Sequence, residues 1–318
     1  MDFYKFFDFL VILKESIKLV TKNGKLVLLL TTLSLLFYSI FFLIFDFSSS
    51  SLMRDMLAKE SLIPISTPQT ADFTNRFSGI EDKSSYVRII YVSFVLSYFF
   101  ITFLSTVALI LVSSDSYNSN ALSLKGSFFS IVKPFTRAFF SGFYTTIFVI
   151  GYVFLIISMA ATVFMSLELN YFSMIDYAVL VIIVSYIFYL YLSSVWIMSI
   201  VVSVVEEDGS GIEALGKSAK IMKGQKIDGF LLNITLHLVS LAVYLCSKMI
   251  SGEKYWVWDT KITVLVLANG SCLVNIFTFV AYTVMYYRGK ERRGQEIELN
   301  LSNFEYTKLG STPLVNGV

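Results

Sequence analysis

Charge is what this 318-residue sequence lacks over most of its length. Only 15% of its residues are charged, against about 25% in typical soluble domains, and 56% are hydrophobic. Six long apolar runs contain no Asp, Glu or Arg, and Lys248 is the one formal charge within them. Because about 20 apolar residues cross a bilayer core, we expect an all-α membrane protein with six transmembrane helices. The runs cover residues 26–45, 89–112, 138–165, 177–205, 229–250 and 262–287.

Residues suited to catalysis or metal binding are also scarce. Both cysteines, Cys246 and Cys272, fall inside apolar runs, which argues against a disulfide framework and against a zinc site. The single histidine, His237, leaves a metal site or a catalytic triad without a second member. Phosphate-binding glycine loops, HExxH and GxSxG are absent. We therefore expect no enzyme activity, catalytic residue, metal or cofactor, and the net charge of +2 is too small to favour nucleic acid.

The basic residues that do occur indicate an orientation. Seventeen of the 25 Lys and Arg residues lie in segments 1–25, 113–137, 206–228 and 288–318, which alternate with the apolar runs. The positive-inside rule places these segments and both termini in the cytosol, and favours neither endomembrane nor plasma membrane. We expect segment 288–318 to be a basic, then disordered tail whose arginines attract anionic lipid. Loop 46–88, on the other side, should be mobile, with at most a short helix near residues 52–59.

A basic amphipathic stretch precedes every second apolar run. This pattern predicts three membrane hairpins, each preceded by a cytosolic helix that lies in the headgroup layer, the first within residues 1–25. The stretch before the third run contains Pro134, which should interrupt or kink its helix. Any cytosolic segment entering a bilayer is selected for lysine and apolar residues, so duplication is one of two explanations. The third stretch has an apolar stripe of Ile212, Leu215, Ala219 and Met222, with Lys217, Lys220 and Lys223 as candidate lipid-headgroup contacts.

The residues between the fourth and fifth runs predict a stiff elbow. Ser210 and Glu213 have the spacing of a capping box, and Gly224 suits a left-handed helix end. Glu206 and Glu207 should lie near the positive N-terminus of the capped helix, where they could pair with lysines of the other basic stretches. A role in lipid binding or substrate gating is the alternative interpretation.

A resemblance to known families rests on this region. Residues 204–224, VVEEDGSGIEALGKSAKIMKG, follow a Trp196-containing run and resemble a plant family of six-span membrane proteins of uncharacterised function. A looser similarity extends to the membrane domain associated with bacterial glycerophosphodiester phosphodiesterases. The resemblance implies a six-span membrane domain over about residues 1–290. The 31 residues from Arg288 onward are too few for a barrel domain, so we do not expect the hydrolase activity.

Polar residues within the fifth and sixth runs form a candidate intramembrane cluster. Asn233, His237 and Ser240 share one face of the fifth helix, and Asn275 lies on a face of the sixth. Hydrogen bonding between helices is the favoured interpretation, since no carboxylate shares the depth of His237. Proton relay or substrate binding is the alternative.

Two functions remain open at this stage. The leading hypothesis is a non-enzymatic protein that binds or organises lipids, and possible partner proteins or further copies of itself, through its basic interfacial helices. The second is a transporter or channel for a neutral or amphiphilic small molecule, because a plan of repeated hairpins also occurs in transporters.

Overall fold

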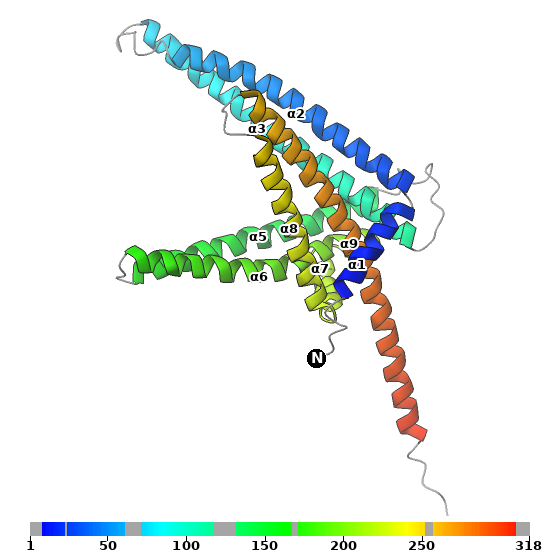
Figure 1. Ribbon diagram of the computed structural model, residues 1–318. Helices are drawn as coiled ribbons and strands as arrows, with labels where there is room; N and C mark the ends of the chain where they lie inside the picture. The colour runs from blue at the N-terminus through cyan, green and yellow to red at the C-terminus, as the bar shows by residue number, and fades with distance from the viewer. Residues whose placement is uncertain are drawn as a thin grey trace, which may run out of the picture. The chain divides into compact units, whose positions relative to one another are not determined.

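The computed structural model describes residues 8–22, 24–60, 71–117, 132–166, 171–251 and 257–309, and every regular element in them is an α-helix (Figure 1). A backbone in hydrocarbon must satisfy its own hydrogen bonds, and the α-helix does so within one segment. The helices are α1 (Asp8–Lys22), α2 (Gly24–Glu60), α3 (Ala71–Tyr117), α5 (Val132–Ser166), α6 (Tyr171–Val205), α7 (Ile212–Met222), α8 (Lys226–Ser251) and α9 (Val257–Leu309).

All six predicted apolar runs lie in helices long enough to cross a membrane, so this is an integral, multi-pass membrane protein. Each apolar stretch is somewhat longer than its predicted run, and five of the six begin before it. They are Lys25–Ser50, Arg88–Tyr117, Val132–Thr162, Asp176–Val205, Lys226–Met249 and Ile262–Gly294.

Two segments expected to lack regular structure are helical instead. The predicted mobile loop 46–88 is wrong: α2 continues to Glu60 and α3 begins at Ala71, so only residues 61–70 of that loop lie outside the described residues. Residues 51–60 include Leu, Met, Ala, Lys and Glu, which are good helix formers, and no Gly or Pro. The tail predicted to be disordered likewise remains helical in α9 as far as Leu309.

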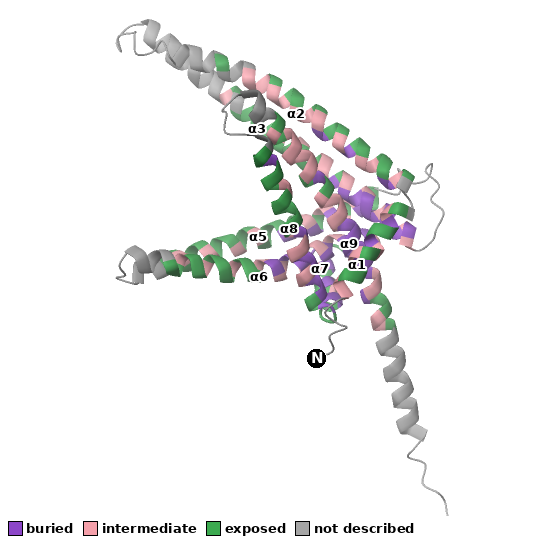
Figure 2. Ribbon diagram, in the orientation of Figure 1, coloured by how far each residue is buried: buried purple, intermediate pink, exposed green. Residues whose placement is uncertain are grey.

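The chain divides into two compact units. Unit 1 comprises residues 1–24, 110–238 and 277–318, and unit 2 comprises 25–109 and 239–276. In unit 1 the buried residues gather around α7, the end of α6 and the middle of α9, as Figure 2 shows. Away from these buried residues, α5 and α6 expose apolar side chains such as Phe154 and Ile182. Such exposure is expected of helices that face lipid.

Within unit 1, α5 and α6 run side by side (Figure 1). The Tyr152 hydroxyl of α5 donates a hydrogen bond to the Ser185 carbonyl of α6 at 2.7 Å. The Tyr152 ring also contacts the rings of Tyr189 and Trp196, at centroid distances of 6.3 and 6.4 Å. The face of α6 that carries Ser185, Tyr189, Ser193 and Trp196 is therefore a packing seam, as its polar spacing indicates.

In unit 2, α2 and α3 are joined by hydrogen-bonded hydroxyl groups and by contacts between aromatic rings. Ser34 of α2 is 2.8 Å from Ser105 of α3, and the Tyr38 hydroxyl donates to Thr102 at 2.6 Å. Farther along the same interface Phe45 contacts Tyr91 edge to face. As the residue number on α2 increases, the number of its contact residue on α3 decreases, so the two helices are antiparallel. Hydrogen bonds and close packing are the interactions available where lipid removes the hydrophobic drive between helices.

The close approach of α8 and α9 in unit 2 yields a stability prediction. A Cβ at Gly270 would overlap the Val243 side chain, whereas a Cβ at Gly151 of α5 would meet nothing within 4 Å. We expect Gly270→Ala to lower the free energy of unfolding by about 1 to 3 kcal/mol, since a stiff valine must move. Gly151→Ala should be neutral or slightly stabilising.

Thermal unfolding in detergent, followed by circular dichroism, measures both effects. Val243→Ala in the Gly270→Ala background should restore most of the loss, because it removes the overlapping methyl groups. Equal melting temperatures for Gly270→Ala and Gly151→Ala would contradict the close approach.

Candidate functional site

The four segments predicted to share one side of the membrane meet at one end of unit 1. Tyr287 of α9 is hydrogen-bonded to Ser114 at the end of α3. Arg137, near the start of α5, donates to the Glu206 carbonyl at 2.7 Å. We call this region the polar end: the described residues of 8–22, 113–117, 132–137, 206–228 and 286–294.

The elbow between α6 and α8 forms differently from its prediction. The N-cap of α7 is Gly211, with φ of 58° and no side-chain capping bond, so the capping box of Ser210 and Glu213 is wrong. The Gly211 N–H instead donates to the Ser141 hydroxyl of α5 at 2.9 Å. Gly224 has no positive φ, so the left-handed helix end predicted there is wrong too. Glycine is required at 211, where the backbone is left-handed and the Tyr144 ring lies close by.

The face that α7 buries is also shifted from the predicted stripe. Its buried residues are Ala214, Ser218, Ile221 and Met222, whereas Ile212 is 61% exposed. Of the predicted stripe only Met222 is buried; Leu215 is half-buried and Ala219 is exposed. Small Ala214 and Ser218 allow α7 to pack closely on its neighbours, which explains why the less apolar side faces inward. Lys220 and Lys223 are exposed.

Pro134, expected to break a helix, lies in the first turn of α5. The N–H groups of the first turn have no helical partner, so proline is tolerated there. Residues 132–137 are thus continuous with the third span. The remainder of the interfacial helix predicted before it, within 118–131, lies outside the described residues.

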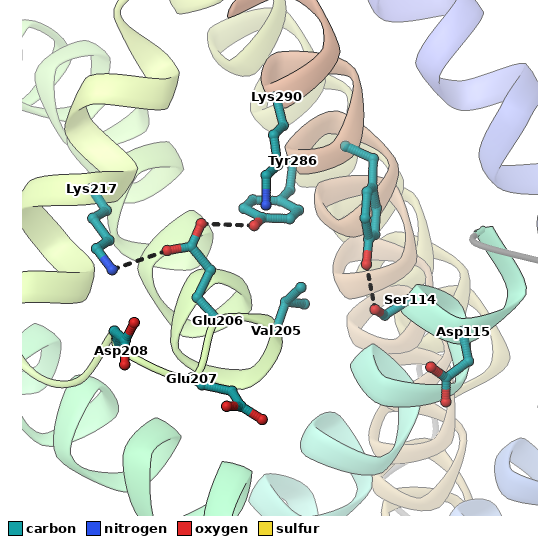
Figure 3. Close-up of a pocket in the computed structure, with 10 residues that line it drawn as sticks. Ser114, Asp115, Val205, Glu206, Glu207, Asp208, Lys217, Tyr286 and Lys290 are labelled. Atoms are coloured by element: carbon teal, nitrogen blue, oxygen red, sulfur yellow. Dashed lines mark hydrogen bonds and ion pairs between the residues drawn. The ribbon is translucent and has the colours of Figure 1, made fainter. Parts of the chain in front are cut away.

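Glu206 connects three elements at the polar end (Figure 3). One carboxylate oxygen accepts a hydrogen bond from the Tyr286 hydroxyl of α9 at 2.8 Å, and the other lies 3.1 Å from the Lys217 ammonium of α7. Lys217 also lies 3.5 Å from Glu213. Glu206 was expected to pair with lysines of the other basic stretches, and Lys217, a candidate lipid contact, is instead its partner. Glu207 is exposed.

The protonation of this pair follows from its contacts. Burial by itself raises the pKa of Glu206, but hydrogen bonds from Tyr286 and Lys217 and the nearby ammonium groups outweigh it and hold the pKa below its usual value. The hydrogen bond to Glu206 is the main cause of a raised pKa at Lys217. Both groups are therefore charged at neutral pH.

Arginines of α9 are paired within the protein. The Arg292 guanidinium lies 2.7 Å from Asp8 of α1 and 3.6 Å from Asp228 of α8, and Arg288 lies 3.7 Å from Glu15 of α1. These two arginines, expected to attract anionic lipid, thus also have partners within the protein. They attach α1 to the polar end.

Helix α1 has two different faces. Ile12, Ser16 and Leu19 are buried. The opposite face exposes both apolar and basic residues, a combination typical of a helix in the headgroup layer. Its exposed residues include Leu10, Val11, Lys14, Ile17 and Lys18.

A cavity of about 820 Å³ opens at the polar end beside Glu206 (Figure 3). It lies among the ends of α3 and α6, the elbow and α9. Its lining residues are Ser114, Asp115, Val205, Glu206, Glu207, Asp208, Lys217, Tyr286, Tyr287 and Lys290. Tyr286 and Lys290 in particular were not recognised as site residues from the sequence. The described residues contain no group of three or more His, Cys, Asp or Glu that could hold a metal ion.

The candidate intramembrane cluster is divided between the two units, with Asn233 and His237 in unit 1. Asn233 is buried and donates to the Leu190 carbonyl at 2.8 Å and to the Ser193 hydroxyl, both on α6. His237 Nδ1 lies 2.9 Å from the Asn233 carbonyl. The His237 ring also contacts the Tyr186 ring of α6 edge to face, so both residues belong to the contact between α8 and α6. Ser240 and Asn275 belong to unit 2.

The comparisons with known proteins show the family. A family defined by a domain of unknown function, DUF8558, matches residues 2–305, so the chain belongs to that family. No curated protein and no solved structure matches the chain.

Removal of one hydroxyl tests the contact between Glu206 and α9. Tyr286→Phe deletes the hydrogen bond to the carboxylate, and we expect the free energy of unfolding to fall by about 1 to 3 kcal/mol. Tyr177→Phe on α6, where the side chain is 45% exposed, is the matched control and should change little. Thermal unfolding in detergent compares the two. A loss no larger than that of the control would contradict the contact.

The shifted pKa values predict how this stabilisation depends on pH. Because the pKa of Glu206 is lowered, its contribution is complete above the ordinary value of 4.5 and is lost as pH falls through the folded value. Because the pKa of Lys217 is raised, its contribution is complete below 10.5 and is lost as pH rises through the folded value. The stability difference between wild type and Glu206→Gln should therefore be constant between these limits and shrink outside them. Unfolding across a pH series checks this, and a difference unchanged down to about pH 3 would contradict it.

Proposed function

We propose that this protein is a non-enzymatic membrane protein that binds lipid at its polar end through the exposed faces of α1 and α7. The observation that carries the proposal is that some charged residues of the polar end form ion pairs within the protein, while others are exposed. Acidic residues and arginines hold α1 in place, while Lys14 and Lys18 remain on its exposed side. Each lysine near an anionic membrane surface contributes about 1 kcal/mol to binding.

The apolar residues beside these lysines support a headgroup location. Leu10, Val11 and Ile17 are 45%, 38% and 56% exposed. Exposure of such neighbouring apolar side chains to water is unfavourable. In the headgroup layer the same residues enter the acyl boundary while the lysines reach phosphates. On α7, Ile212, Lys220 and Lys223 are exposed and offer a second, smaller surface of the same kind.

The proposal includes the topology. With the polar end in the cytosol, as the positive-inside rule predicts, α1 and α7 precede the first and fifth spans as interfacial helices, and both termini are cytosolic. The paired helices α2 with α3 and α5 with α6 then form membrane hairpins, and α8 with α9 completes the plan of three. The resemblance of residues 204–224 to plant and bacterial six-span families is consistent with such a membrane role and suggests no reaction.

A transporter gains no comparable support. Asn233 and His237 would be the polar groups of a pathway through unit 1, but Asn233 is buried against Leu190 and Ser193. Its amide is used in helix packing.

Lipid selectivity in proteoliposomes tests the proposal. Spin-labelled phosphatidylserine and phosphatidylcholine report how strongly each lipid associates with the reconstituted full-length protein. We expect Lys14→Glu/Lys18→Glu to lower the preference for phosphatidylserine about tenfold, and Lys220→Glu/Lys223→Glu to lower it less. High salt should weaken the wild-type preference in the same direction.

The matched control reverses two exposed charges on the opposite side of the predicted topology, Arg54→Glu/Arg88→Glu. This variant should keep the wild-type preference. If the α1 variant also keeps it, or if the control loses as much, lipid binding by α1 is refuted.

A further inference from the structure

The cavity at the polar end carries an excess of negative charge. Lys217 neutralises Glu206, so the remaining charged lining groups are three carboxylates and one ammonium, Lys290. Asp115, Glu207 and Asp208 form no ion pair with any described residue. A basic protein surface therefore encloses a pocket that favours a cation.

The nature of that cation follows from the aromatic lining. Tyr286 and Tyr287 both line the cavity, and the Lys290 ammonium lies 5.8 Å from the centroid of the Tyr286 ring. An ammonium over a tyrosine face is attracted by the ring quadrupole. The protein's own lysine thus shows that an organic ammonium can lie over the Tyr286 ring in this cavity. Metal ions fit less well, because the described carboxylates do not converge as a ligand group.

The depth of the cavity favours a lipid source for this ammonium. Ser114 and Asp115 lie at the end of the second apolar span, Val205 ends the fourth, and Tyr286 lies near the end of the sixth. Span ends lie at the level of the headgroups. A volume of about 820 Å³ leaves room for a headgroup beside the lysine.

We propose that this cavity binds an organic ammonium group, of the kind carried by phosphatidylcholine and phosphatidylethanolamine. The carboxylates of Asp115, Glu207 and Asp208 attract the ammonium, and the Tyr286 and Tyr287 rings pack against it. The inference extends the proposed lipid binding but uses different residues and the opposite charge, so the two can fail separately.

Calorimetric titration of the full-length protein in maltoside detergent tests it with three probes. Short-chain dihexanoyl phosphatidylcholine should bind, and dihexanoyl phosphatidylglycerol, which lacks an ammonium, should bind at least tenfold more weakly. Choline chloride tests the ammonium alone: binding of choline as well assigns the site to organic ammonium in general, and binding of the phospholipid alone assigns it to the lipid headgroup. Equal binding of the two phospholipids overturns the proposal.

Variants locate the binding in the cavity. Asp115→Asn/Glu207→Gln/Asp208→Asn should weaken phosphatidylcholine binding about tenfold, and the single change Asp208→Asn should weaken it less but measurably. Asp176→Asn, an exposed carboxylate at the opposite end of α6, is the matched control and should bind as wild type does. If the triple variant misfolds, Asp208→Asn decides, since its side chain is exposed. Wild-type affinity in that variant overturns the proposal.

Lys290→Met provides a test in the opposite direction. It removes the resident ammonium and one positive charge, so the affinity for the ammonium ligand should rise severalfold. That ligand is choline if choline binds the wild type, and phosphatidylcholine if it does not. A fall in that affinity would contradict an ammonium site over the Tyr286 ring.

Discussion

The hydrocarbon core of the membrane is the constraint on which the rest of this structure depends. An unpaired peptide group or an isolated charge there costs several kcal/mol, so the chain crosses as helices and its ionisable groups collect at the ends. Hydroxyl groups within the spans also form hydrogen bonds inside the protein. Ser193, Ser199 and Ser203 of α6 each donate to a carbonyl three residues earlier in their own helix. Asn233 and Tyr152 instead connect α6 to α8 and α5, as the hydroxyl pairs of unit 2 connect α2 to α3.

Charged residues at and beyond the ends of the spans organise the polar end. Glu206 joins the end of α6 to α7 through Lys217 and to α9 through Tyr286, while its carbonyl accepts from Arg137 of α5. Arg292 joins α1 and α8 to α9 in the same manner. These pairs are only partly buried, so each contributes modestly to stability; together they specify which helices meet. Charged residues of the polar end that form no ion pair with a described residue then make up the two proposed surfaces of opposite charge.

The spans were predictable because hydropathy is a local property of the chain. Contacts that join distant segments were not: 80 residues separate Glu206 from Tyr286, and no pattern in the sequence couples them. Arg292 was assigned to lipid because its partners, Asp8 and Asp228, lie in other segments. The capping box failed for a more local reason. Ser210 has the spacing of an N-cap, but the left-handed Gly211 takes that position and donates to Ser141 on another helix.

The two charged surfaces of the polar end can coexist because topology depends on only one sign of charge. Lys and Arg determine which loops stay in the cytosol, and Asp and Glu contribute little. Carboxylates such as Asp115, Glu207 and Asp208 can therefore gather in a pocket without opposing the orientation that the positive-inside rule predicts. A membrane presents both anionic phosphates and cationic ammonium groups at the same depth. A polar end with exposed lysines and an acidic, tyrosine-lined pocket is complementary to both, which one uniformly basic surface would not be.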